Sequence, residues 1–300
     1  MNPHNKQKII GRRIKIGILG CGRISINHIK ALALHYKSID LVALCDNKKE
    51  SINNALKTLE ESFDKDEKIV FKPQVFYEYN DLLNEVKAGK IAIDLIVIAT
   101  PSGLHSQQTI SAAKIGLHVC TEKPMATKWK DGLAMQNACD EAGVKLFVVK
   151  QNRFNSTLQL VKKQINKGRF GKIAMVGINV FWQRPQSYYD KDFWRGTWEF
   201  DGGALMNQAS HYVDLLHWLF GPVEYINAIM GTISRKIEVE DTAALNIKWR
   251  DGAIGSMAVT MLTYPENLEG SITILGDKGS VKIAGKAVNK IEYWNFSDND

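Results

Sequence analysis

Residues 14–25 have the sequence Ile-Lys-Ile-Gly-Ile-Leu-Gly-Cys-Gly-Arg-Ile-Ser, an apolar strand that runs directly into a glycine turn. A helical pattern follows the turn and continues to about Tyr36. In this strand–turn–helix context, Gly20 and Gly22 predict a turn whose backbone can approach a pyrophosphate, with the N–H groups of the helix N-terminus beside it. Ser25 stands where Gly or Ala is more usual, and its small side chain still permits close packing of helix and strand. A plain glycine-rich turn is the alternative interpretation.

The next apolar strand, residues 41–45, ends in Asp46. An acidic side chain about 20 residues after the glycines of such a turn is placed to hold the ribose hydroxyls of a dinucleotide. Its charge also repels a 2′-phosphate, so Asp46 favours NAD over NADP. The alternative is an Asp that caps the N-terminus of the following helix.

Strands and helices alternate through the first half of the chain. Residues 51–66 and 80–88 are expected to be helical, with a strand at Val70–Phe71 between them. Residues 93–99 are almost entirely apolar, which is typical of a strand buried on both faces. This alternation predicts an α/β fold with a parallel, doubly wound sheet, and we expect residues 1–150 to form an NAD-binding domain.

Two loops follow predicted strands at their carboxyl ends, the edge of a doubly wound sheet where ligands bind. The first contains Thr100, Ser102 and His105, and we expect it to pass over the nicotinamide side of the cofactor. The second is Thr121-Glu122-Lys123-Pro124. A lysine desolvated at the edge of a cofactor cleft can act as an acid or base. The alternative is a charged loop without a chemical role.

The composition fits an ordinary globular protein of two domains, because the chain has 300 residues, of which 45% are hydrophobic and 24% charged. No stretch approaches the ~18 to 20 apolar residues of a membrane span, and no apolar signal segment follows the basic N-terminus. The four cysteines have neither metal spacing nor a disulfide framework, which favours free thiols in a reducing cytoplasm. The net charge of +7 is compatible with an anionic ligand, whereas no arginine-rich tract or basic helix indicates nucleic acid.

The second half, residues 151–300, carries an aromatic and basic loop at residues 182–198. Arg184, Tyr188 and Arg195 lie in this loop. Arginine suits bidentate contacts with phosphate or carboxylate, and aromatic rings stack on bases or sugars. A domain or subunit interface is an equally good interpretation, because interfaces favour the same residue types.

Gly202-Gly203 precedes a predicted helix with a polar face. Asn207 and His211 are four residues apart and therefore share a face of that helix. Asp214 follows three residues later and is placed to fix the tautomer of the imidazole. A structural histidine is the alternative.

From Val223 onwards the pattern predicts antiparallel strands. The turns Arg250-Asp251-Gly252 and Gly276-Asp277-Lys278-Gly279 each separate two strand-like runs, as in hairpins. A large open sheet with one face uncovered by helices usually packs on another subunit. We therefore expect a homo-oligomer, either a dimer or a tetramer.

Taken together, these motifs resemble those of the glucose–fructose oxidoreductase/inositol dehydrogenase (Gfo/Idh/MocA) family. The matching segments are Gly20-Cys21-Gly22, Ala99-Thr100-Pro101-Ser102 with His105, Glu122-Lys123-Pro124, and Gly202-Gly203 followed by His211 and Asp214. The resemblance covers nearly the whole chain. It implies a Rossmann domain, then an α/β domain with a large, mostly antiparallel open sheet, and NAD(P)-dependent oxidation or reduction of sugars and cyclitols. Lys123 matches the family's catalytic lysine, and His211 matches its active-site histidine.

One subgroup is similar in more detail. Residues 184–189, 194–198 and 204–208 resemble the UDP-N-acetylglucosaminuronate 3-dehydrogenases of bacterial O-antigen and lipopolysaccharide synthesis. Asn207 stands where many family members carry Asp. The resemblance implies oxidation of the sugar C3 hydroxyl to a ketone for later amination, with 2-oxoglutarate recycling NADH in some members. The alternatives are a dehydrogenase of a free sugar or cyclitol, and a non-catalytic NAD-binding protein of the same fold.

The motifs and the resemblance together give a set of expected site residues. We expect Lys123 to be the general base, His211 to bind the same hydroxyl or relay its proton, and Asn207 to orient the substrate as a neutral donor. The expected cofactor-binding residues are Gly20, Gly22, Arg23, Ile24, Asp46, Thr100, Ser102, His105, Glu122, Lys123 and Gln151. The expected substrate-binding residues are Lys123, Arg153, Arg184, Tyr188, Arg195, Asn207 and His211, and no metal site is expected.

Overall fold

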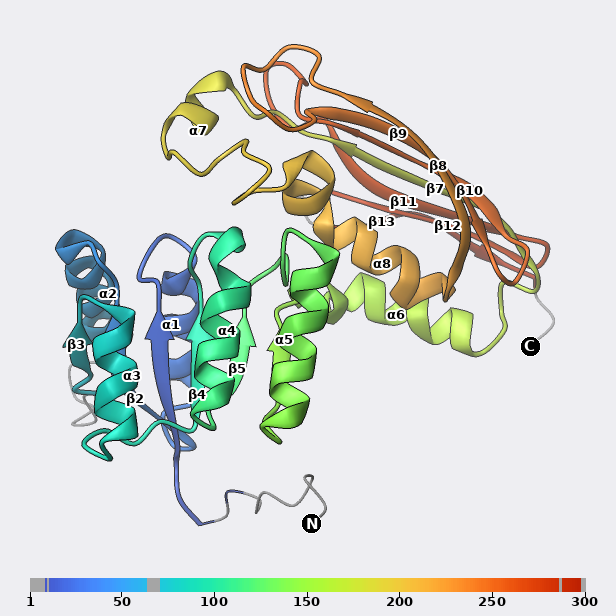
Figure 1. Cartoon of the computed structure of the whole chain (residues 1–300). Coiled ribbons are helices and arrows are strands. Elements are labelled where there is room, and N and C mark those ends of the chain that lie inside the picture. Colours follow the sequence, from blue (N-terminus) through green and yellow to red (C-terminus); the bar gives the residue numbers. More distant parts are fainter. Residues whose placement is uncertain (1–8, 10, 64–70, 286–287, 298–300) are drawn as a thin grey trace. The chain divides into compact units, whose positions relative to one another are not determined.

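The computed structural model describes residue 9 and residues 11–63, 71–285 and 288–297. The chain divides into two compact units, Met1–Val149 and Lys150–Asp300 (Figure 1). Each unit has its own sheet and its own buried core.

The first unit is a six-stranded sheet in the order β3-β2-β1-β4-β5-β6, and every pair of neighbouring strands is parallel. Its elements are β1 (Ile14–Leu19), α1 (Ser25–Leu34), β2 (Ile39–Cys45), α2 (Lys49–Glu61), β3 (Gln74–Phe76), α3 (Tyr79–Lys87), β4 (Leu95–Ile98), η1 (Ser102–Leu104), α4 (His105–Lys114), β5 (His118–Thr121), α5 (Trp129–Glu141) and β6 (Leu146–Val148). One core lies beneath α1 and α2, and another lies beneath α3 and α4. The sheet therefore has helices on both faces, which confirms the predicted doubly wound fold.

The apolar sequence of β4 explains its central position. Ile96, Val97 and Ile98 are consecutive and all buried, with relative exposures of 0%, 4% and 0%. Successive side chains of a strand point to opposite faces, so such a run is stable only where helices cover both faces.

The prediction of a strand at Val70–Phe71 is wrong for Phe71, the one of the two residues that the structure describes. Val70 lies outside the described residues, and Phe71 is buried but belongs to no strand. The edge strand β3 begins at Gln74, and its three residues are intermediate or exposed. Phe71 instead packs edge-to-face on Phe63, with ring centroids 5.3 Å apart. Its apolar character therefore reflects the core beneath α2 and not a strand.

The second unit is a seven-stranded sheet in the order β13-β12-β11-β7-β10-β9-β8, antiparallel except for the pair β7–β10. Its elements are η2 (Gln151–Phe154), α6 (Ser156–Asn166), β7 (Ile173–Phe181), α7 (Gln186–Asp190), η3 (Ala204–Gln208), α8 (Ser210–Phe220), β8 (Val223–Gly231), β9 (Thr242–Trp249), β10 (Ile254–Thr260), β11 (Glu269–Gly276), β12 (Gly279–Ala284) and β13 (Lys290–Phe296). The mostly antiparallel sheet is as predicted.

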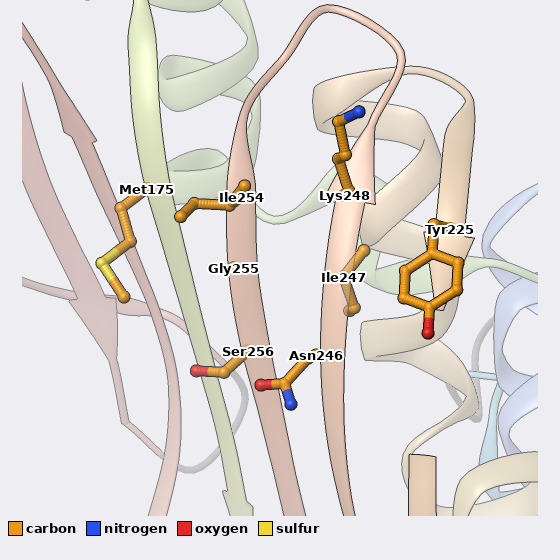
Figure 2. Close-up of a pocket in the computed structure, with 8 residues that line it drawn as sticks. All are labelled: Met175, Tyr225, Asn246, Ile247, Lys248, Ile254, Gly255 and Ser256. Carbon is orange, nitrogen blue, oxygen red and sulfur yellow. The ribbon is translucent and has the colours of Figure 1, made fainter. Parts of the chain in front are cut away.

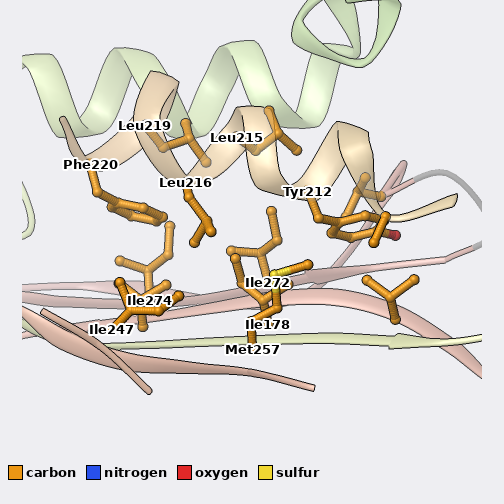
Figure 3. Packing of buried hydrophobic residues seen from close by; sticks show 14 of the residues in the cluster. Ile178, Tyr212, Leu215, Leu216, Leu219, Phe220, Ile247, Met257, Ile272 and Ile274 are labelled. Atoms are coloured by element: carbon orange, nitrogen blue, oxygen red, sulfur yellow. The ribbon is translucent and has the colours of Figure 1, made fainter. Parts of the chain in front are cut away.

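Helix α8 packs its apolar side on one face of this sheet (Figure 3). Tyr212, Leu216 and Phe220 face strand residues such as Ile178 and Met257, and all five belong to one buried cluster. A fully buried aliphatic or aromatic side chain contributes about 1.5–3 kcal/mol, so this cluster fixes α8 and the polar residues of the same helix.

The opposite face of the sheet is open. It carries a shallow groove of about 340 Å³ across β7, β8, β9 and β10 (Figure 2). Its lining residues are Met175, Tyr225, Asn246, Ile247, Lys248, Ile254, Gly255 and Ser256. Asn246 and Ser256 alternate along their strands with Leu245 and Met257, which pack in the cluster beneath α8, so the groove lies on the other face of the sheet.

No helix in the part of the chain that the structure describes is both long enough and apolar enough to cross a membrane.

Candidate functional site

The glycine turn after β1 requires glycine at Gly20. Its φ is +90°, and a Cβ there would lie 2.7–2.8 Å from the backbone of Ala99 and Thr100. The turn therefore packs directly on the end of β4. Nothing lies within 4 Å of a Cβ placed on Gly22, so that position opens on free space. Ser25 is buried, and its hydroxyl donates to the carbonyl of Gly22 at 2.6 Å, which closes the turn.

Arg23 and Ile24 form the end of this turn, immediately before α1 begins at Ser25. Arg23 is exposed and Ile24 is half-buried. Both therefore lie beside the helix N-terminus, where an anionic group of a dinucleotide is expected.

Asp46 stabilises the same turn through hydrogen bonds to the backbone. One carboxylate oxygen accepts the N–H of Cys21 at 2.7 Å, and the other accepts the N–H of Lys48 at 2.8 Å. Helix α2 is capped by Lys48, so Asp46 is not its N-cap. A carboxylate offers about four acceptor sites, so two remain for the ribose hydroxyls of a dinucleotide. The open space over Gly22 and this acceptor together fit NAD.

His105 joins the two loops at the carboxyl edge of the sheet. Its Nδ1 lies 2.8 Å from the carbonyl oxygen of Pro124 and its Nε2 lies 2.9 Å from that of Thr100. Burial lowers the pKa of His105, and the two carbonyls act in the opposite direction. Because the ring is fully buried, His105 would influence a cofactor through the backbone that it holds.

Thr100 and Ser102 differ in how they are placed within the first of these loops. The hydroxyl of Thr100 donates to the amide oxygen of Gln108 at 2.5 Å. Ser102 is buried at the start of η1. Their contact with a cofactor stays a prediction.

Glu122 follows β5 and is buried, with 7% of its surface exposed. Its Oε1 accepts a hydrogen bond from Nε2 of His28 at 2.8 Å, and its Oε2 accepts from the N–H of Lys123 at 3.1 Å. Burial alone would raise the pKa of Glu122, but the hydrogen bond and charge of His28, with those of Lys123, hold it below its ordinary value. The sequence had not indicated His28, although a titratable residue in the first turn of α1 was a signal for it.

The second unit brings Gln151 and His211 together. Nε2 of Gln151 lies 3.2 Å from Nε2 of His211, whose side chain is 9% exposed. If the amide donates, a neutral His211 carries its proton on Nδ1. Gln151 was expected to bind the cofactor, and its contact with the imidazole gives it a different partner within this unit.

Asp214 binds Arg153 in a bidentate ion pair. Nε and Nη2 of Arg153 donate to the two carboxylate oxygens at 2.7 and 2.6 Å, and Nζ of Lys150 lies 4.0 Å away. The hydrogen bond to Asp214 raises the pKa of Arg153, whereas burial lowers the pKa of Lys150. A guanidinium has five N–H donors, so three donors of Arg153 lie outside this ion pair.

Asn207 lies in a π-helical segment, η3, directly before α8. Short π segments inside helices occur frequently at functional sites. The amide Nδ2 of Asn207 donates to Oδ1 of Asp201, and Oδ2 of this fully buried aspartate accepts the N–H of Gly196 at 2.7 Å. The Asn207 amide, which we expected to donate to the substrate, therefore donates to Asp201 inside the protein. This contact fixes the orientation of the amide.

Gly203 is required at the start of this segment because its φ is +92° and a Cβ would lie 2.0 Å from Oε2 of Glu240. Glu240 is buried and accepts the N–H of Leu205 at 2.8 Å, and burial raises its pKa. The pair Gly202-Gly203 thus allows a buried carboxylate to hold the backbone before Asn207.

The aromatic and basic loop forms an alternating stack. The guanidinium carbon of Arg184 lies 5.2 Å from the ring centre of Trp182 and 5.5 Å from that of Tyr188. Arg195 lies 4.4 Å from Tyr188 and 4.5 Å from Trp194. Such contacts contribute about 0.5–1 kcal/mol at exposed sites and about 2 when desolvated, so the stack orders the loop.

The two arginines of this stack differ in their polar partners. Arg195 also donates to Asp192 at 2.8 Å, and only 11% of its side chain is exposed. Arg184 donates to the carbonyl of Gln183 at 2.7 Å and has no ion pair among the described residues. Arg184 is therefore the better candidate to bind an anion.

The predicted residues are distributed over both units: Lys123 belongs to the first, and His211, Asn207, Arg153 and Arg184 belong to the second. No group of three or more His, Cys, Asp or Glu residues that could hold a metal ion occurs among the described residues.

Two family models match the chain. Residues 14–150 match the model described as "Oxidoreductase family, NAD-binding Rossmann fold", and residues 158–282 match the "GFO/IDH/MocA C-terminal domain". Among curated proteins, scyllo-inositol 2-dehydrogenase (NADP(+)) IolW of Bacillus subtilis (strain 168) is 28% identical over 176 residues, which are 59% of this chain and 47% of that protein. The chain spans about half the length of the curated relatives that it matches first.

Two crystal structures are more similar. The WlbA dehydrogenase from Bordetella pertussis, in complex with NADH and UDP-GlcNAcA, is 54% identical, with a TM-score of 0.89 over 98% of this chain and 83% of that one. The WlbA dehydrogenase from Chromobacterium violaceum, also with NADH and UDP-GlcNAcA, is 51% identical, with a TM-score of 0.89 over 97% of this chain and 80% of that one. With both of its units matched, the chain belongs to the Gfo/Idh/MocA family of oxidoreductases and has that family's NAD-binding Rossmann fold.

Proposed function

We propose that the protein oxidises the C3 hydroxyl of UDP-N-acetylglucosaminuronate (UDP-GlcNAcA) to a ketone, with NAD as the oxidant. The observation that carries this proposal is the similarity, above 50% identity along nearly the whole chain, to two dehydrogenases crystallised with NADH and UDP-GlcNAcA. The acceptor at Asp46 and the open turn at Gly22 support NAD.

In this proposal Lys123 removes the proton of the C3 hydroxyl. A general base must be neutral when it acts, so in this proposal Lys123 accepts the proton as an amine at the carboxyl end of β5. When bound, NAD⁺ accepts the hydride from C3. The hydroxyl proton moves to the Lys123 amine as the C3–O bond becomes a carbonyl, so the products are the 3-keto sugar, NADH and a protonated Lys123.

His211 and Asn207 are proposed to position the sugar. His211 is held by Gln151, and Asn207 is held by the buried Asp201, so both side chains are fixed before substrate arrives. Fixed polar groups lower the barrier because they need no reorganisation during the reaction.

Arg184 and Arg153 are proposed to bind the anionic parts of the substrate. UDP-GlcNAcA carries a diphosphate and a carboxylate, and arginine is suited to bidentate contacts with both. The ring of Tyr188 next to Arg184 offers a surface for the uracil or sugar. Each charge-assisted contact contributes about 1.5–3 kcal/mol, so losing one weakens binding by roughly one to two powers of ten.

The decisive experiment mixes the purified protein with NAD⁺ and UDP-GlcNAcA, follows NADH absorbance, and identifies the product by mass. We expect UDP-GlcNAcA to reduce NAD and UDP-N-acetylglucosamine, which lacks the carboxylate, to do so poorly. Arg184→Met should raise the KM for UDP-GlcNAcA, whereas Arg250→Met, in an exposed hairpin turn, is the matched control. Efficient oxidation of a free cyclitol or sugar, with no response to any UDP-sugar, would contradict the proposal and favour activities such as those of the inositol and levoglucosan dehydrogenases.

We also propose that the open face of the second sheet packs on a second copy of the chain, giving a dimer or tetramer. Tyr225, Ile229 and Ile254 on this side are 58%, 79% and 55% exposed, which is unusual for large apolar residues in strands. Ser256→Arg should then reduce the mass measured by light scattering. An unchanged mass would place the subunit contact elsewhere.

Two further proposals concern the setting of the reaction. We propose that 2-oxoglutarate reoxidises bound NADH, which release of 2-hydroxyglutarate during turnover would test. The product would serve O-antigen or lipopolysaccharide sugar synthesis in the cytoplasm, where UDP-sugars and aminotransferases act. A gene deletion that leaves these glycans unchanged would contradict this role.

A further inference from the structure

The segment between β8 and β9, residues 232–241, folds around the carboxylate of Asp241. This aspartate has no exposed surface. Its Oδ1 accepts the N–H of Ile233 at 3.0 Å, and its Oδ2 accepts the N–H groups of Ser234 at 3.0 Å and Arg235 at 2.9 Å. Burial alone would raise the pKa of Asp241, but these N–H groups hold it below its ordinary value. The carboxylate therefore fixes the backbone from which the Arg235 side chain extends.

Arg235 connects this segment to the aromatic and basic loop. The side chain is half-buried, and its Nε donates to the main-chain carbonyl of Arg184 at 2.7 Å, across 51 positions of sequence. The N–H of Arg184 donates to the carbonyl of Met261 at 2.9 Å. Both main-chain polar groups of Arg184 therefore have partners in other parts of the second unit.

A second contact joins the same two segments. Oε1 of Gln186 accepts the N–H of Lys236 at 2.9 Å, and Nε2 of Gln186 donates to the carbonyl of Lys236 at 3.3 Å. The loop is thus held on both sides of Pro185, by Arg235 at position 184 and by Lys236 at position 186. This arrangement determines where the side chain of Arg184 leaves the main chain.

The position of the main chain matters because the guanidinium of Arg184 lies between two rings. Its guanidinium carbon is 5.2 Å from the ring centre of Trp182 and 5.5 Å from that of Tyr188. A bidentate contact with phosphate or carboxylate depends on the orientation of the guanidinium plane. A side chain that is already ordered also loses less entropy when a ligand binds.

We propose that Arg235 is a positioning residue for Arg184, and thereby for the anionic part of the substrate. Its Nε holds the carbonyl of Arg184, so that the guanidinium occupies its place between Trp182 and Tyr188 before the substrate binds. The inference rests on the proposed role of Arg184 in binding UDP-GlcNAcA.

Two substitutions at position 235 separate the hydrogen bond from the charge. Arg235→Met removes both. Arg235→Gln removes the charge and keeps an N–H donor, because Nε2 of glutamine and Nε of arginine are the same number of bonds from Cα. If Arg235 acts through its hydrogen bond to Arg184, Arg235→Gln should therefore behave like the unmodified protein and Arg235→Met should not.

The first measurement is hydrogen–deuterium exchange of the full-length protein without ligand, followed by mass spectrometry. Peptides from residues 182–190 report on the loop, and peptides from α5 in the other unit are the internal reference. We expect exchange in the loop to be about three- to tenfold faster in Arg235→Met, which is the range for the loss of one hydrogen bond, and unchanged in Arg235→Gln. Unchanged exchange in Arg235→Met would overturn the proposal.

The second measurement is the affinity for UDP-GlcNAcA of protein loaded with NADH, which cannot oxidise the sugar. By calorimetry, Arg235→Met should bind about three- to tenfold more weakly and Arg235→Gln should bind normally. The value of kcat should not change in either variant, whereas a general structural defect would lower it. Equal weakening in Arg235→Gln and Arg235→Met would overturn the proposal, because it would mean that the charge of Arg235 acts on the substrate directly.

A double variant tests whether the effect passes through Arg184. Arg184→Met with Arg235→Met should have the same affinity as Arg184→Met alone, because the side chain that Arg235 positions is already absent. Further weakening in the double variant would overturn the proposal. If Arg235→Met does not fold, Arg235→Gln decides: normal binding sustains the proposal and weakened binding overturns it.

The two measurements distinguish failure of this inference from failure of the proposed function. Faster exchange in Arg235→Met, with no binding of any UDP-sugar to the unmodified protein, would reject the proposed function and keep Arg235 as the support of Arg184. Normal binding of UDP-GlcNAcA to the unmodified protein and to Arg235→Met would keep the proposed substrate and overturn the inference.

Discussion

Replacing Asp46 tests whether one carboxylate both selects NAD and braces the glycine turn. The structure gives Asp46 two charge-assisted hydrogen bonds, from Cys21 N–H at 2.7 Å and from Lys48 N–H at 2.8 Å. Asp46→Ala removes both bonds together with the charge. Asp46→Asn removes the charge and keeps one acceptor oxygen, so comparing the two separates electrostatic selection from support of the turn.

The expected magnitudes follow from these contacts. Hydrogen bonds to a charged group contribute about 1.5–3 kcal/mol each, so Asp46→Ala should lower the free energy of unfolding by about 3 kcal/mol and Asp46→Asn by about half of that. A similar loss at the ribose weakens NAD binding roughly ten- to a hundredfold in both variants. NADP lacks the 2′-hydroxyl and loses its repulsion from the carboxylate, so its affinity should rise or stay constant.

The assay is titration of NAD⁺ and NADP⁺ by fluorescence or calorimetry at one fixed ionic strength, with urea unfolding of the same samples. Asp140→Asn, an exposed residue of α5, is the matched control. The unmodified protein should bind NADP much more weakly than NAD, and Asp46→Asn should narrow that difference by about tenfold or more. Equal affinity of the unmodified protein for both cofactors, or an unchanged ratio in Asp46→Asn, would refute the reasoning.

Four further predictions concern other residues of the site. Lys123→Met should lower turnover by ~10² to 10⁴ with NAD affinity largely kept, as steady-state kinetics and NAD titration will measure, and near-normal turnover would exclude Lys123 as the base. Gly20→Ala should lower the free energy of unfolding by at least about 2 kcal/mol, measured in urea, because it adds a left-handed penalty to a backbone clash. Arg153→Met should lower the free energy of unfolding by about 1.5–3 kcal/mol, because the carboxylate of Asp214 loses its bidentate partner. An unchanged free energy of unfolding would mean that Lys150 alone stabilises this carboxylate. The pKa of Glu122 lies below its ordinary value of about 4.3, so ionised Glu122 stabilises the fold above that pH. This contribution is lost as the pH falls through the pKa of the folded protein. In Glu122→Gln the free energy of unfolding, followed by circular dichroism, should therefore depend less on pH below about 4.3.

Local patterns predicted the fold of both units because the motifs depend on neighbours in the sequence. The glycine turn, the apolar run of β4 and the hairpins of the second sheet each have a signal within a few residues. The family models confirm the family and its NAD-binding Rossmann fold. The prediction of a strand at Val70–Phe71 was wrong because a short apolar run has the same sequence pattern in a strand and in a loop that covers a core.

The partners of the site residues could not be predicted in the same way. His28 and Glu122 are 94 positions apart, and Arg153 and Asp214 are 61 apart, so only the folded chain brings each pair together. The sequence placed Asp214 beside His211 from helical spacing, whereas its carboxylate is bound by Arg153. Helical spacing indicates which residues can meet on one face, but it does not determine which partner a charged side chain takes.

The asparagine at position 207 has a physical reason in this chain. Its Nδ2 donates to Asp201, which has no exposed surface, and Glu240 nearby is already a buried carboxylate with a raised pKa. An aspartate at 207 would face the carboxylate of Asp201 and add a third acidic group to a desolvated cluster. Like charges in such a site cannot all ionise, so one would have to hold a proton at neutral pH. Asparagine at 207 donates a hydrogen bond to Asp201 without adding a charge to this buried cluster.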